Sequence, residues 1–295
     1  MGRINRYSQT NNYVEPDDLS IDSALKVAQA AARMGGKIVR QRFGKTASIS
    51  WKSDIEVQTE VDIEAEQVIT AFIKDHFSKH SILGEECGMR WGHSPYTWII
   101  DPLDGTNNFV LNIPQFAICV SLKKHDDVLF TVIHQPMLDI TYTALKGKGA
   151  YLNNEQIRLQ ELETPLHKST VCSILAYSVH SNSVTHSIFS RLYKGTRRLL
   201  DTWAPSLDWC MLAAGKIDAL VYLSDESLWD DPGMLAGAFL FLEAHGLIDD
   251  LSLRGAGEAI NALRDTSIIA ASSNHMIDQV NELIDSAPLV EEELV

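Results

Sequence analysis

The sequence predicts a mixed fold in which an α+β half is followed by an α/β half. Two helical patterns, and then a series of short apolar strands separated by polar or glycine-containing turns, fill the chain to about residue 160. Beyond that point strands and helices alternate. The chain has 295 residues, of which 45% are hydrophobic and 22% charged, so it is long enough for one large domain or two ordinary ones.

The chain begins with a polar segment, residues 1–19, that we expect to be a loose lead-in. Ser20 is a suitable N-cap for a first helix extending to Phe43, because apolar residues recur behind it at helical spacing. The glycine pair at 35–36 is expected to weaken or bend this helix. A second helix, with one apolar face, is predicted from about 62 to 77.

The rest of the first half is predicted to consist of short strands. Two apolar runs flank the polar stretch 123–127 and predict a hairpin, and the strands after it continue the antiparallel pattern around two glycines. The expected strands are 81–83, 96–100, 117–122, 128–133, 140–144 and 150–152.

The second half is predicted to alternate strands with helices, and the whole chain shows no internal repeat. We expect strands at 171–175, 219–223 and 267–271, helices at 184–194, 206–214, 233–244 and 276–284, an irregular segment at 249–262, and an acidic tail at 291–293. The predicted organisation is therefore a lead-in at 1–19, an α+β half at 20–160 that carries most of the candidate metal ligands, and an α/β half at 161–295.

The composition excludes several classes of protein. The formal charge of −14 argues against non-specific nucleic-acid binding and against docking to anionic membranes. No apolar run approaches the roughly 18 residues of a membrane-spanning helix, and the polar N-terminus does not resemble a secretory signal. The four cysteines are far apart and predict free thiols in a reducing compartment, so a cytoplasmic location is expected: Cys87, Cys119, Cys172 and Cys210.

Acidic residues gather at the ends of predicted strands and the starts of helices: Asp62, Glu85, Glu86, Asp101, Asp104, Asp230 and Asp231. Carboxylates that converge repel one another unless they are protonated or bridged by a cation. A set of oxygen ligands suits magnesium, manganese or calcium. In the run 101–106, Gly105 lets the backbone approach a ligand closely, and a helix beginning near Thr106 would direct N–H groups at an anion. The run therefore predicts a site for a cation and a phosphate ester.

Each of these acidic residues has a simpler interpretation when it is taken alone. A single aspartate before a helix, such as Asp62 or Asp230, is commonly an N-cap. The pair 85–86 fits a solvated turn, and Asp104 followed by glycine is a common turn sequence. The run 101–106 directly behind an apolar strand is the feature that turn chemistry does not explain, and it favours the metal site.

At these residues the chain resembles the inositol monophosphatase family of metal-dependent phosphatases. Residues 98–109, Trp-Ile-Ile-Asp-Pro-Leu-Asp-Gly-Thr-Asn-Asn-Phe, are similar to the first family signature. Gly84-Glu85-Glu86 is similar to the upstream acidic motif and Trp229-Asp230 to the downstream one. Further similar stretches at 147–153, 213–219 and 243–246 extend the resemblance over about residues 20–275, in the order of the family.

The resemblance implies an αβαβα sandwich, usually a homodimer, with the site between its two halves. It implies two or three Mg²⁺ ions. Glu85, Asp101 and the carbonyl of Leu103 are similar to the ligands of the first ion, and Glu85 to a ligand of a third, mostly hydrated ion. The residues of this chain that are similar to the ligands of the second ion are Asp101, Asp104 and Asp230.

The resemblance also implies the chemistry. Asp62 and Thr106 are similar to the pair of residues that orients and deprotonates a water molecule, and Glu85 is expected to take part beside them. The backbone amides of Gly105 and Thr106 are similar to a pair that binds phosphate oxygens. The expected reaction is direct in-line attack by metal-activated water on a phosphomonoester, without a phosphoenzyme and with inhibition by lithium.

The chain departs from the family pattern where the substrate is expected. The run Thr202-Trp203-Ala204 stands in place of a small Gly-Ser/Thr-Ala step before the helix at 206, so the bulky indole of Trp203 is expected to narrow or reshape the pocket of the leaving group. Tyr222 aligns with an acidic residue that contacts inositol hydroxyls in many members. Asp231 is either an N-cap, which we favour, or a further ligand, and Glu226 is close enough in sequence to join the site.

We therefore expect a Mg²⁺-dependent phosphatase of a small phosphorylated metabolite, first of all inositol monophosphate. Fructose-1,6-bisphosphate, histidinol phosphate, NADP and a 3′-phosphoadenosine nucleotide remain alternative substrates. A catalytically idle dimeric scaffold that binds other proteins is the alternative of another class. It is disfavoured because no predicted ligand is visibly lost from the sequence.

Overall fold

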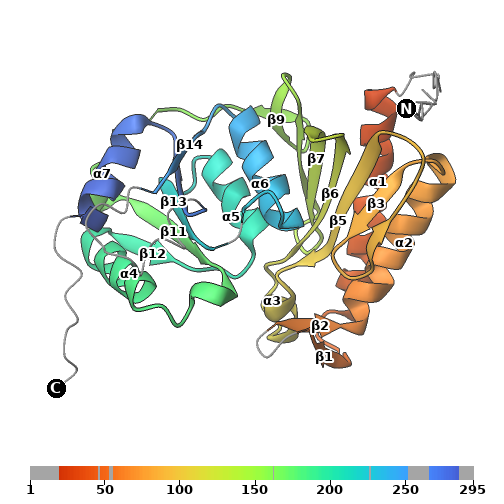
Figure 1. Cartoon of the computed structure of the whole chain (residues 1–295), viewed down its shortest axis with the longest axis horizontal. Helices are drawn as coiled ribbons and strands as arrows, with labels where there is room; N and C mark the ends of the chain where they lie inside the picture. The colour runs from red at the N-terminus through yellow and green to blue at the C-terminus, as the bar shows by residue number, and fades with distance from the viewer. Residues whose placement is uncertain are drawn as a thin grey trace, which may run out of the picture.

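A computed structural model describes residues 20–45, 47–52, 56–161, 163–225, 227–251 and 266–285. The predicted lead-in, the acidic tail, Glu226 and most of the irregular segment 249–262 lie outside these residues. The described elements form five layers, seen edge-on in Figure 1: helices, a sheet, helices, a second sheet and helices. The predicted mixed fold and the αβαβα sandwich are confirmed.

The first layer consists of helices α1 (Ile21–Arg42) and α2 (Glu60–His76), which pack on each other and on the larger sheet. Helix α1 is capped by the Ser20 side chain, as predicted. Helix α1 continues without a break through the glycine pair at 35–36. A Cβ on Gly35 would lie 2.6 Å from the side chain of Ile69, and one on Gly36 would lie 2.7 Å from the ring of His134. The glycines are therefore needed for close packing of α1 on α2 and β7.

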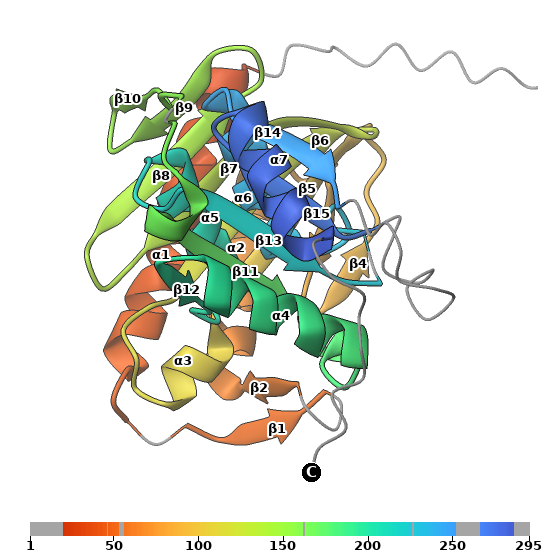
Figure 2. The ribbon, with the colours of Figure 1, turned by 90° about the vertical axis from the view of Figure 1, so that its left-hand side faces the viewer.

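The larger sheet has eight strands in the order β10-β9-β8-β7-β6-β5-β3-β4. All its neighbours are antiparallel except β3 and β5, which are parallel. Its strands are β3 (Ser81–Gly84), β4 (Gly88–Arg90), β5 (Tyr96–Asp104), β6 (Ala117–Lys124), β7 (Asp127–Gln135), β8 (Ile140–Leu145), β9 (Gly149–Leu152) and β10 (Glu155–Ile157). A separate two-stranded ribbon, β1 (Ile49–Trp51) and β2 (Val57–Thr59), lies beside the short helix α3 (Thr106–Val110), as Figure 2 shows.

The smaller sheet has five strands in the order β12-β11-β13-β15-β14. It is mixed: β11 is parallel to β12 and β13, whereas β15 is antiparallel to β13 and β14. Its strands are β11 (Thr170–Leu175), β12 (Arg198–Leu200), β13 (Ala219–Leu223), β14 (Leu247–Asp250) and β15 (Ile268–Ala271). Helices α4 (Ser183–Gly195) and α7 (Asn274–Asp285) cover its outer face (Figure 2).

The middle layer consists of helices α5 (Pro205–Ala213) and α6 (Pro232–Glu243), which lie between the two sheets (Figure 1). Because sheets face them on both sides, their side chains are apolar nearly all around and almost wholly buried. The two helices pack closely, since a Cβ on Gly237 of α6 would lie 2.5 Å from Cβ of Trp209 in α5. None of the helices in the described ranges combines the length and the apolar character needed to cross a membrane.

Replacing Gly237 with alanine is expected to destabilise the protein, because the added methyl group collides with the buried Trp209. Overpacking of this kind costs about 1–3 kcal/mol, and better helix propensity returns at most about 1 kcal/mol of it. Urea unfolding followed by tryptophan fluorescence would measure the change. Ser190→Ala, at an exposed position of α4, is the control and should stay within about 0.5 kcal/mol of the parent chain. An unchanged midpoint for Gly237→Ala would contradict this packing.

Candidate metal and phosphate site

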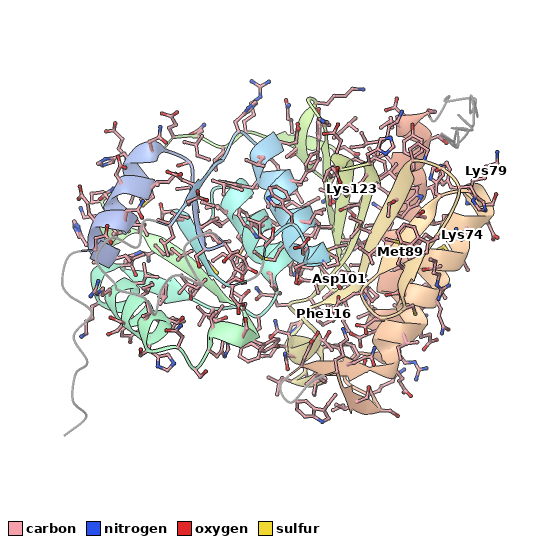
Figure 3. The ribbon with its side chains drawn as sticks, viewed as in Figure 1. Lys74, Lys79, Met89, Asp101, Phe116 and Lys123 are labelled. Atoms are coloured by element: carbon pink, nitrogen blue, oxygen red, sulfur yellow. The ribbon has the colours of Figure 1, made fainter. Side chains whose placement is uncertain are left out.

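A cavity of about 180 Å³ opens between the two halves of the molecule, where β5 ends and α3, α5 and α6 begin. Figure 3 places Asp101 at this meeting point, in the middle of the molecule. The first half contributes one wall: Glu56, Val57, Glu85, Asp101, Leu103, Asp104, Gly105, Thr106 and Asn107. The second half contributes the other: Ile174, Leu175, Tyr177, His180, Asp201, Trp203, Pro205, Asp208 and Asp231.

Asp101 and Asp104 occupy the last part of β5, where its register with β6 shifts. The shift turns both carboxylates to the cavity, and backbone amides hold each of them in place. Oδ1 of Asp101 accepts a hydrogen bond from the N–H of Leu103 at 2.9 Å. Oδ2 of Asp104 accepts the N–H of Ser206 at 3.0 Å, in the first turn of α5. The carboxylates are therefore fixed before any ligand arrives.

Asp231 brings a third carboxylate to the same place from the second half. It is the N-cap of α6, where its Oδ1 accepts the N–H of Met234 at 2.7 Å. Gly233 lies among the three acids: a Cβ there would be 3.0 Å from oxygens of both Asp101 and Asp104 and 3.4 Å from Oδ1 of Asp231. Glycine at this position thus leaves open a small space that three carboxylates face.

Burial of these carboxylates is costly without a cation. Burial raises the pKa of Asp101 well above its ordinary value, and the charges of Glu85 and Asp104 raise it further. The pKa of Asp104 is also raised well above its ordinary range by burial. A bound divalent cation would remove this penalty, and oxygen donors are those that Mg²⁺ prefers. The residues present therefore fit a magnesium site.

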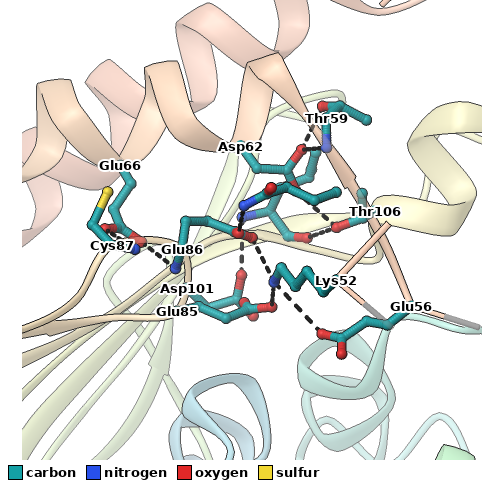
Figure 4. A network of polar contacts seen from close by, with 12 residues as sticks. Lys52, Glu56, Thr59, Asp62, Glu66, Glu85, Glu86, Cys87, Asp101 and Thr106 are labelled. Carbon is teal, nitrogen blue, oxygen red and sulfur yellow. Dashed lines mark hydrogen bonds and ion pairs between the residues drawn. The ribbon is translucent and has the colours of Figure 1, made fainter. Parts of the chain in front are cut away.

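Glu85 stands at the rim of this cluster, in the turn between β3 and β4. It shares a hydrogen bond with Asp101, and its Oε1 lies 2.8 Å from the Nζ of Lys52. Lys52 also lies 2.8 Å from Oε1 of Glu86 and 3.5 Å from Oε1 of Glu56, so one ammonium group bridges three carboxylates (Figure 4). Among the described residues, no group of three or more Asp, Glu, His or Cys side chains is arranged so that it could hold a metal ion without movement.

Glu66 of α2 fixes the turn that carries Glu85. Its buried carboxylate accepts the backbone N–H groups of Glu86 at 2.8 Å and of Cys87 at 3.0 Å (Figure 4). A Cβ on Gly84 would lie 2.2 Å from Oε1 of Glu66, so only glycine allows this approach. The motif Gly84-Glu85-Glu86 thus combines a required glycine with a ligand candidate. The contribution of Glu66 was not predicted from the sequence.

Asp62 and Thr106 are in direct contact, as Figure 4 shows. Thr106 Oγ1 lies 2.8 Å from Oδ1 of Asp62 and 3.0 Å from the carbonyl oxygen of Leu103. The other oxygen of Asp62 accepts the backbone N–H of Thr59 at 2.9 Å, within a capping box at the start of α2. Burial raises the pKa of Asp62 to about 6, against the opposing effect of these hydrogen bonds. Thr106 lines the cavity, whereas Asp62 lies behind it.

Asp230, which the resemblance predicts as a ligand of the second ion, does not line the cavity. Asp230 and Asp231 are both exposed, and of the two it is Asp231 that lines the cavity. The physical reason is the cap: Asp231 has an extended backbone, Pro232 begins α6, and the side chain of Asp231 turns back to the helix terminus beside Gly233. Asp231 is therefore the predicted N-cap and a member of the acidic cluster at once.

Two residues predicted for the substrate pocket are not on its wall. Ala204 is fully buried at the start of α5, where its Cβ would lie 3.3 Å from a Cβ on Gly105. Tyr222 is buried within β13, in the core between that sheet and the middle helices. Trp203 does line the cavity, as do Gly105 and Thr106. Sequence reasoning did not find several other lining residues, which belong to no motif: Glu56, Tyr177, His180 and Asp201.

Comparisons with known proteins found relatives that match most of the chain. The profile of the Inositol monophosphatase family matches residues 20–288. The chain is 32% identical over 225 residues, 76% of this chain and 84% of the relative, to the "Fructose-1,6-bisphosphatase/inositol-1-monophosphatase" of Aquifex aeolicus. It is also 32% identical over 240 residues, 77% and 85% of the two chains, to the "Nus factor SuhB" of Pseudomonas aeruginosa. An IMPase structure from Thermotoga maritima superposes with a TM-score of 0.75 at 28% identity, covering 92% of this chain and 99% of that one.

Asp231→Asn is expected to abolish stabilisation by Mg²⁺, whereas Asp230→Asn should leave it intact. Asparagine is as good an N-cap as aspartate, so α6 is preserved and only the charge facing Gly233 is lost. The measurement is the melting temperature of each variant with and without millimolar Mg²⁺. The opposite pattern, in which Asp230→Asn loses the metal effect and Asp231→Asn keeps it, would overturn this assignment.

In the absence of metal, Asp104→Asn is expected to stabilise the chain, and the gain should grow as the pH rises. The pKa of Asp104 is raised by burial, so the folded state keeps a proton that the unfolded state loses above about pH 4. The parent chain therefore loses stability with rising pH, and the amide does not. Thermal unfolding in a chelator between about pH 5 and pH 8 would measure the difference. A gain that shrinks with rising pH would contradict this origin of the pKa shift.

Proposed function

The chain belongs to the inositol monophosphatase family, and from this premise we propose that it is a Mg²⁺-dependent phosphomonoesterase of a small phosphorylated metabolite. One observation carries the proposal: three carboxylates, of Asp101, Asp104 and Asp231, face the space kept open by Gly233, next to Thr106 and Asp62. Hydrolysis of a phosphate ester needs a cation to bind its oxygens and a base to deprotonate the attacking water. The three carboxylates are candidate ligands of the cation, and Thr106 with Asp62 is the candidate base.

Asp101, Asp104, Asp231, Glu85 and the carbonyl of Leu103 are the groups that would hold two or three Mg²⁺ ions. All of them line the cavity. When bound, the ions would lower the pKa of water and neutralise the charge that develops on the leaving alcohol oxygen. The side chains supply the geometry: amides of Leu103 and Ser206 keep the carboxylates of Asp101 and Asp104 from turning away.

Thr106 and Asp62 are positioned to move the proton of the attacking water. Thr106 Oγ1 donates to Oδ1 of Asp62, which leaves the lone pairs of that hydroxyl available to accept a hydrogen bond from water on the cavity side. As water attacks phosphorus, its proton passes to Thr106 and the proton of Thr106 passes to Asp62. The bond between phosphorus and the alcohol oxygen breaks on the opposite side. A carboxylate whose pKa is raised to about 6 is a suitable base near neutral pH.

Inositol monophosphate is the first substrate to test, and lithium inhibition, a homodimer and a cytoplasmic location form part of the proposal. The relative from Aquifex aeolicus is named for both fructose-1,6-bisphosphate and inositol-1-phosphate, so a second sugar phosphate belongs in the same test. The departures in the second half, Trp203 above all, are the reason to include phosphate esters of other alcohols.

A second candidate is a role as a protein-binding factor. It is favoured by the similarity to the Pseudomonas aeruginosa protein that is named a Nus factor. This role does not require turnover, so it would tolerate loss of the carboxylates. The retention of Asp101, Asp104 and Glu85 around one cavity supports the enzymatic proposal over a scaffold alone.

Phosphate release from a panel of phosphomonoesters is expected to require Mg²⁺ and to fall when lithium is added. Asp101→Asn should reduce the rate at least about 100-fold, because even outer-shell partners of a metal contribute 10–100-fold. The asparagine variant should remain folded, as judged by circular dichroism. Release by Asp101→Asn at the rate of the parent chain would refute the site. A folded parent chain that is stabilised by Mg²⁺ and hydrolyses no ester would favour the protein-binding role.

A further inference from the structure

The hydroxyl group of Tyr177 has a proton that the described chain does not use. Tyr177 lines the cavity from the second half, in the short 3-10 helix η2 (Tyr177–Val179) that follows β11. Its oxygen accepts a hydrogen bond from Nδ2 of Asn107 at 2.6 Å. A tyrosine hydroxyl can accept and donate at the same time, and the described residues provide no acceptor for its proton. The O–H group is therefore available to donate to a ligand in the cavity.

Neighbouring groups hold the phenol ring of Tyr177 in place. The ring of Trp203 meets it edge to face, with centroids 6.4 Å apart, and the ring of His180 lies on it at 5.7 Å. The next residue, Ser178, anchors η2 because its hydroxyl donates a hydrogen bond to the carboxylate of Asp225. The position of the hydroxyl is thus set by packing and by η2, so a ligand that it binds pays little to order it.

Asn107 brings this hydroxyl to the end of the cavity where the reaction is proposed. Asn107 directly follows Thr106, the residue proposed to face the attacking water, in the first turn of α3. The next side chain, that of Asn108, donates from Nδ2 to the carbonyl oxygen of Thr202 at 2.7 Å. Two neighbouring side chains of α3 are therefore bonded to the second half of the molecule. These bonds keep the Tyr177 hydroxyl close to Thr106.

The side chains of the cavity offer few positive charges to a phosphate group. No lysine or arginine belongs to its described lining, where His180 is the one residue that can become a cation. The ammonium group of Lys52 is already shared by three carboxylates, those of Glu56, Glu85 and Glu86. Phosphate oxygens that no metal ion binds therefore need neutral donors. A hydrogen bond from a neutral donor to a charged oxygen is about twice as strong as one between two neutral groups.

The Tyr177 hydroxyl has the properties of such a donor. Burial raises its pKa above the ordinary value, and the charges of Glu56 and Asp201 raise it further, against the hydrogen bond from Asn107. The group therefore keeps its proton near neutral pH. Because it carries no charge, it can bind a phosphate oxygen without repelling cations held by the carboxylate cluster, which a lysine in its place would do.

We propose that the hydroxyl of Tyr177, oriented by Asn107, donates a hydrogen bond to a non-bridging phosphate oxygen of the substrate. This rests on the proposed phosphatase function and adds to it a phosphate ligand from the second half. The resemblance assigns phosphate binding to the amides of Gly105 and Thr106, which belong to the first half, so Tyr177 contacts the group from the opposite wall. Every substrate of the enzyme carries the phosphate, and the contact is therefore independent of the alcohol.

The first measurement is the stabilisation of the folded chain by inorganic phosphate, which is the product common to all the esters. Melting temperatures are recorded with Mg²⁺ alone and with Mg²⁺ and increasing phosphate. Tyr177→Phe keeps the ring and its packing and removes only the hydroxyl. Mg²⁺ alone should stabilise this variant as much as the parent chain. The phosphate concentration that gives the same further stabilisation should rise about tenfold or more, because a hydrogen bond to a charged group has this strength.

The second measurement compares esters of two different alcohols, inositol 1-phosphate and glycerol 2-phosphate. Tyr177→Phe should lower kcat/KM at least about tenfold, and by the same factor for both esters, since the lost hydrogen bond belongs to the phosphate. Tyr193→Phe is the matched control. Tyr193 is 70% exposed on α4 and does not line the cavity, so this variant should keep the kinetics and the phosphate affinity of the parent chain.

A double variant tests the part that Asn107 takes. Asn107→Ala removes the donor that orients the hydroxyl, and alanine favours the helix at this position. The single variant should weaken phosphate stabilisation less than Tyr177→Phe does. Adding Asn107→Ala to Tyr177→Phe should cause no further loss, because residues that act through one contact are not additive.

The outcomes separate this inference from the proposed function. Unchanged phosphate stabilisation in Tyr177→Phe, or a loss of kcat/KM that differs between the two esters, would overturn the phosphate contact while leaving a phosphatase. Additive losses in the double variant would overturn the role of Asn107. If the parent chain hydrolyses no ester, the proposed function fails, and the phosphate titration alone then decides the contact. A parent chain that phosphate does not stabilise in the presence of Mg²⁺ would overturn the inference.

Discussion

The repulsion among buried carboxylates at the junction of the two halves is the constraint on which the site depends. Asp101 and Asp104 are buried, and their pKa values are raised well above the ordinary range because burial disfavours their charges and each faces other acids. Such a cluster destabilises the folded chain unless a proton or a cation compensates it. In the proposed function the same groups are the oxygen ligands of a phosphate-processing cation. The instability of the metal-free cluster and its affinity for a cation would then have the same physical origin.

The N-termini of α5 and α6 reduce the free-energy cost of bringing these carboxylates together. Asp104 accepts the N–H of Ser206 at the start of α5, and Asp231 caps α6, so two carboxylates face the positive ends of helix dipoles. Both helices are buried between sheets and cannot shift away. Gly233 and Gly84 then remove the side chains that would fill the space or displace Glu66. The acids are held by backbone groups on rigid elements, which keeps the cluster in place before a ligand binds.

The sequence predicted the long elements and the acidic residues that the first half brings to the cavity, because their patterns are local. Apolar periodicity located α1, α2 and the central strands, and the run 101–106 behind β5 located the acidic cluster. Three-residue strands such as β1, β4 and β12 have too few positions to show alternation. The resemblance assigned the second-half ligand to Asp230, whereas the structure shows that its neighbour Asp231 both caps α6 and lines the cavity. Tyr177 and Asp201 reach the cavity only through tertiary packing, so no motif could reveal them.

The two walls of the cavity are built from different kinds of structure. The carboxylates proposed to hold the metal lie on regular elements, whereas Trp203, predicted for the substrate pocket, lies in a short link. The carboxylates come from the end of β5 and the first turns of buried helices, where any change disturbs packing. Trp203 lies in a link between β12 and α5, where a new side chain alters the cavity and leaves those elements intact. A neighbouring position is less free, because Ala204 is fully buried against Gly105. A substitution at Trp203 can thus change the substrate preference while the proposed reaction stays the same. The residue at this position is therefore a better guide to the substrate than the carboxylates are.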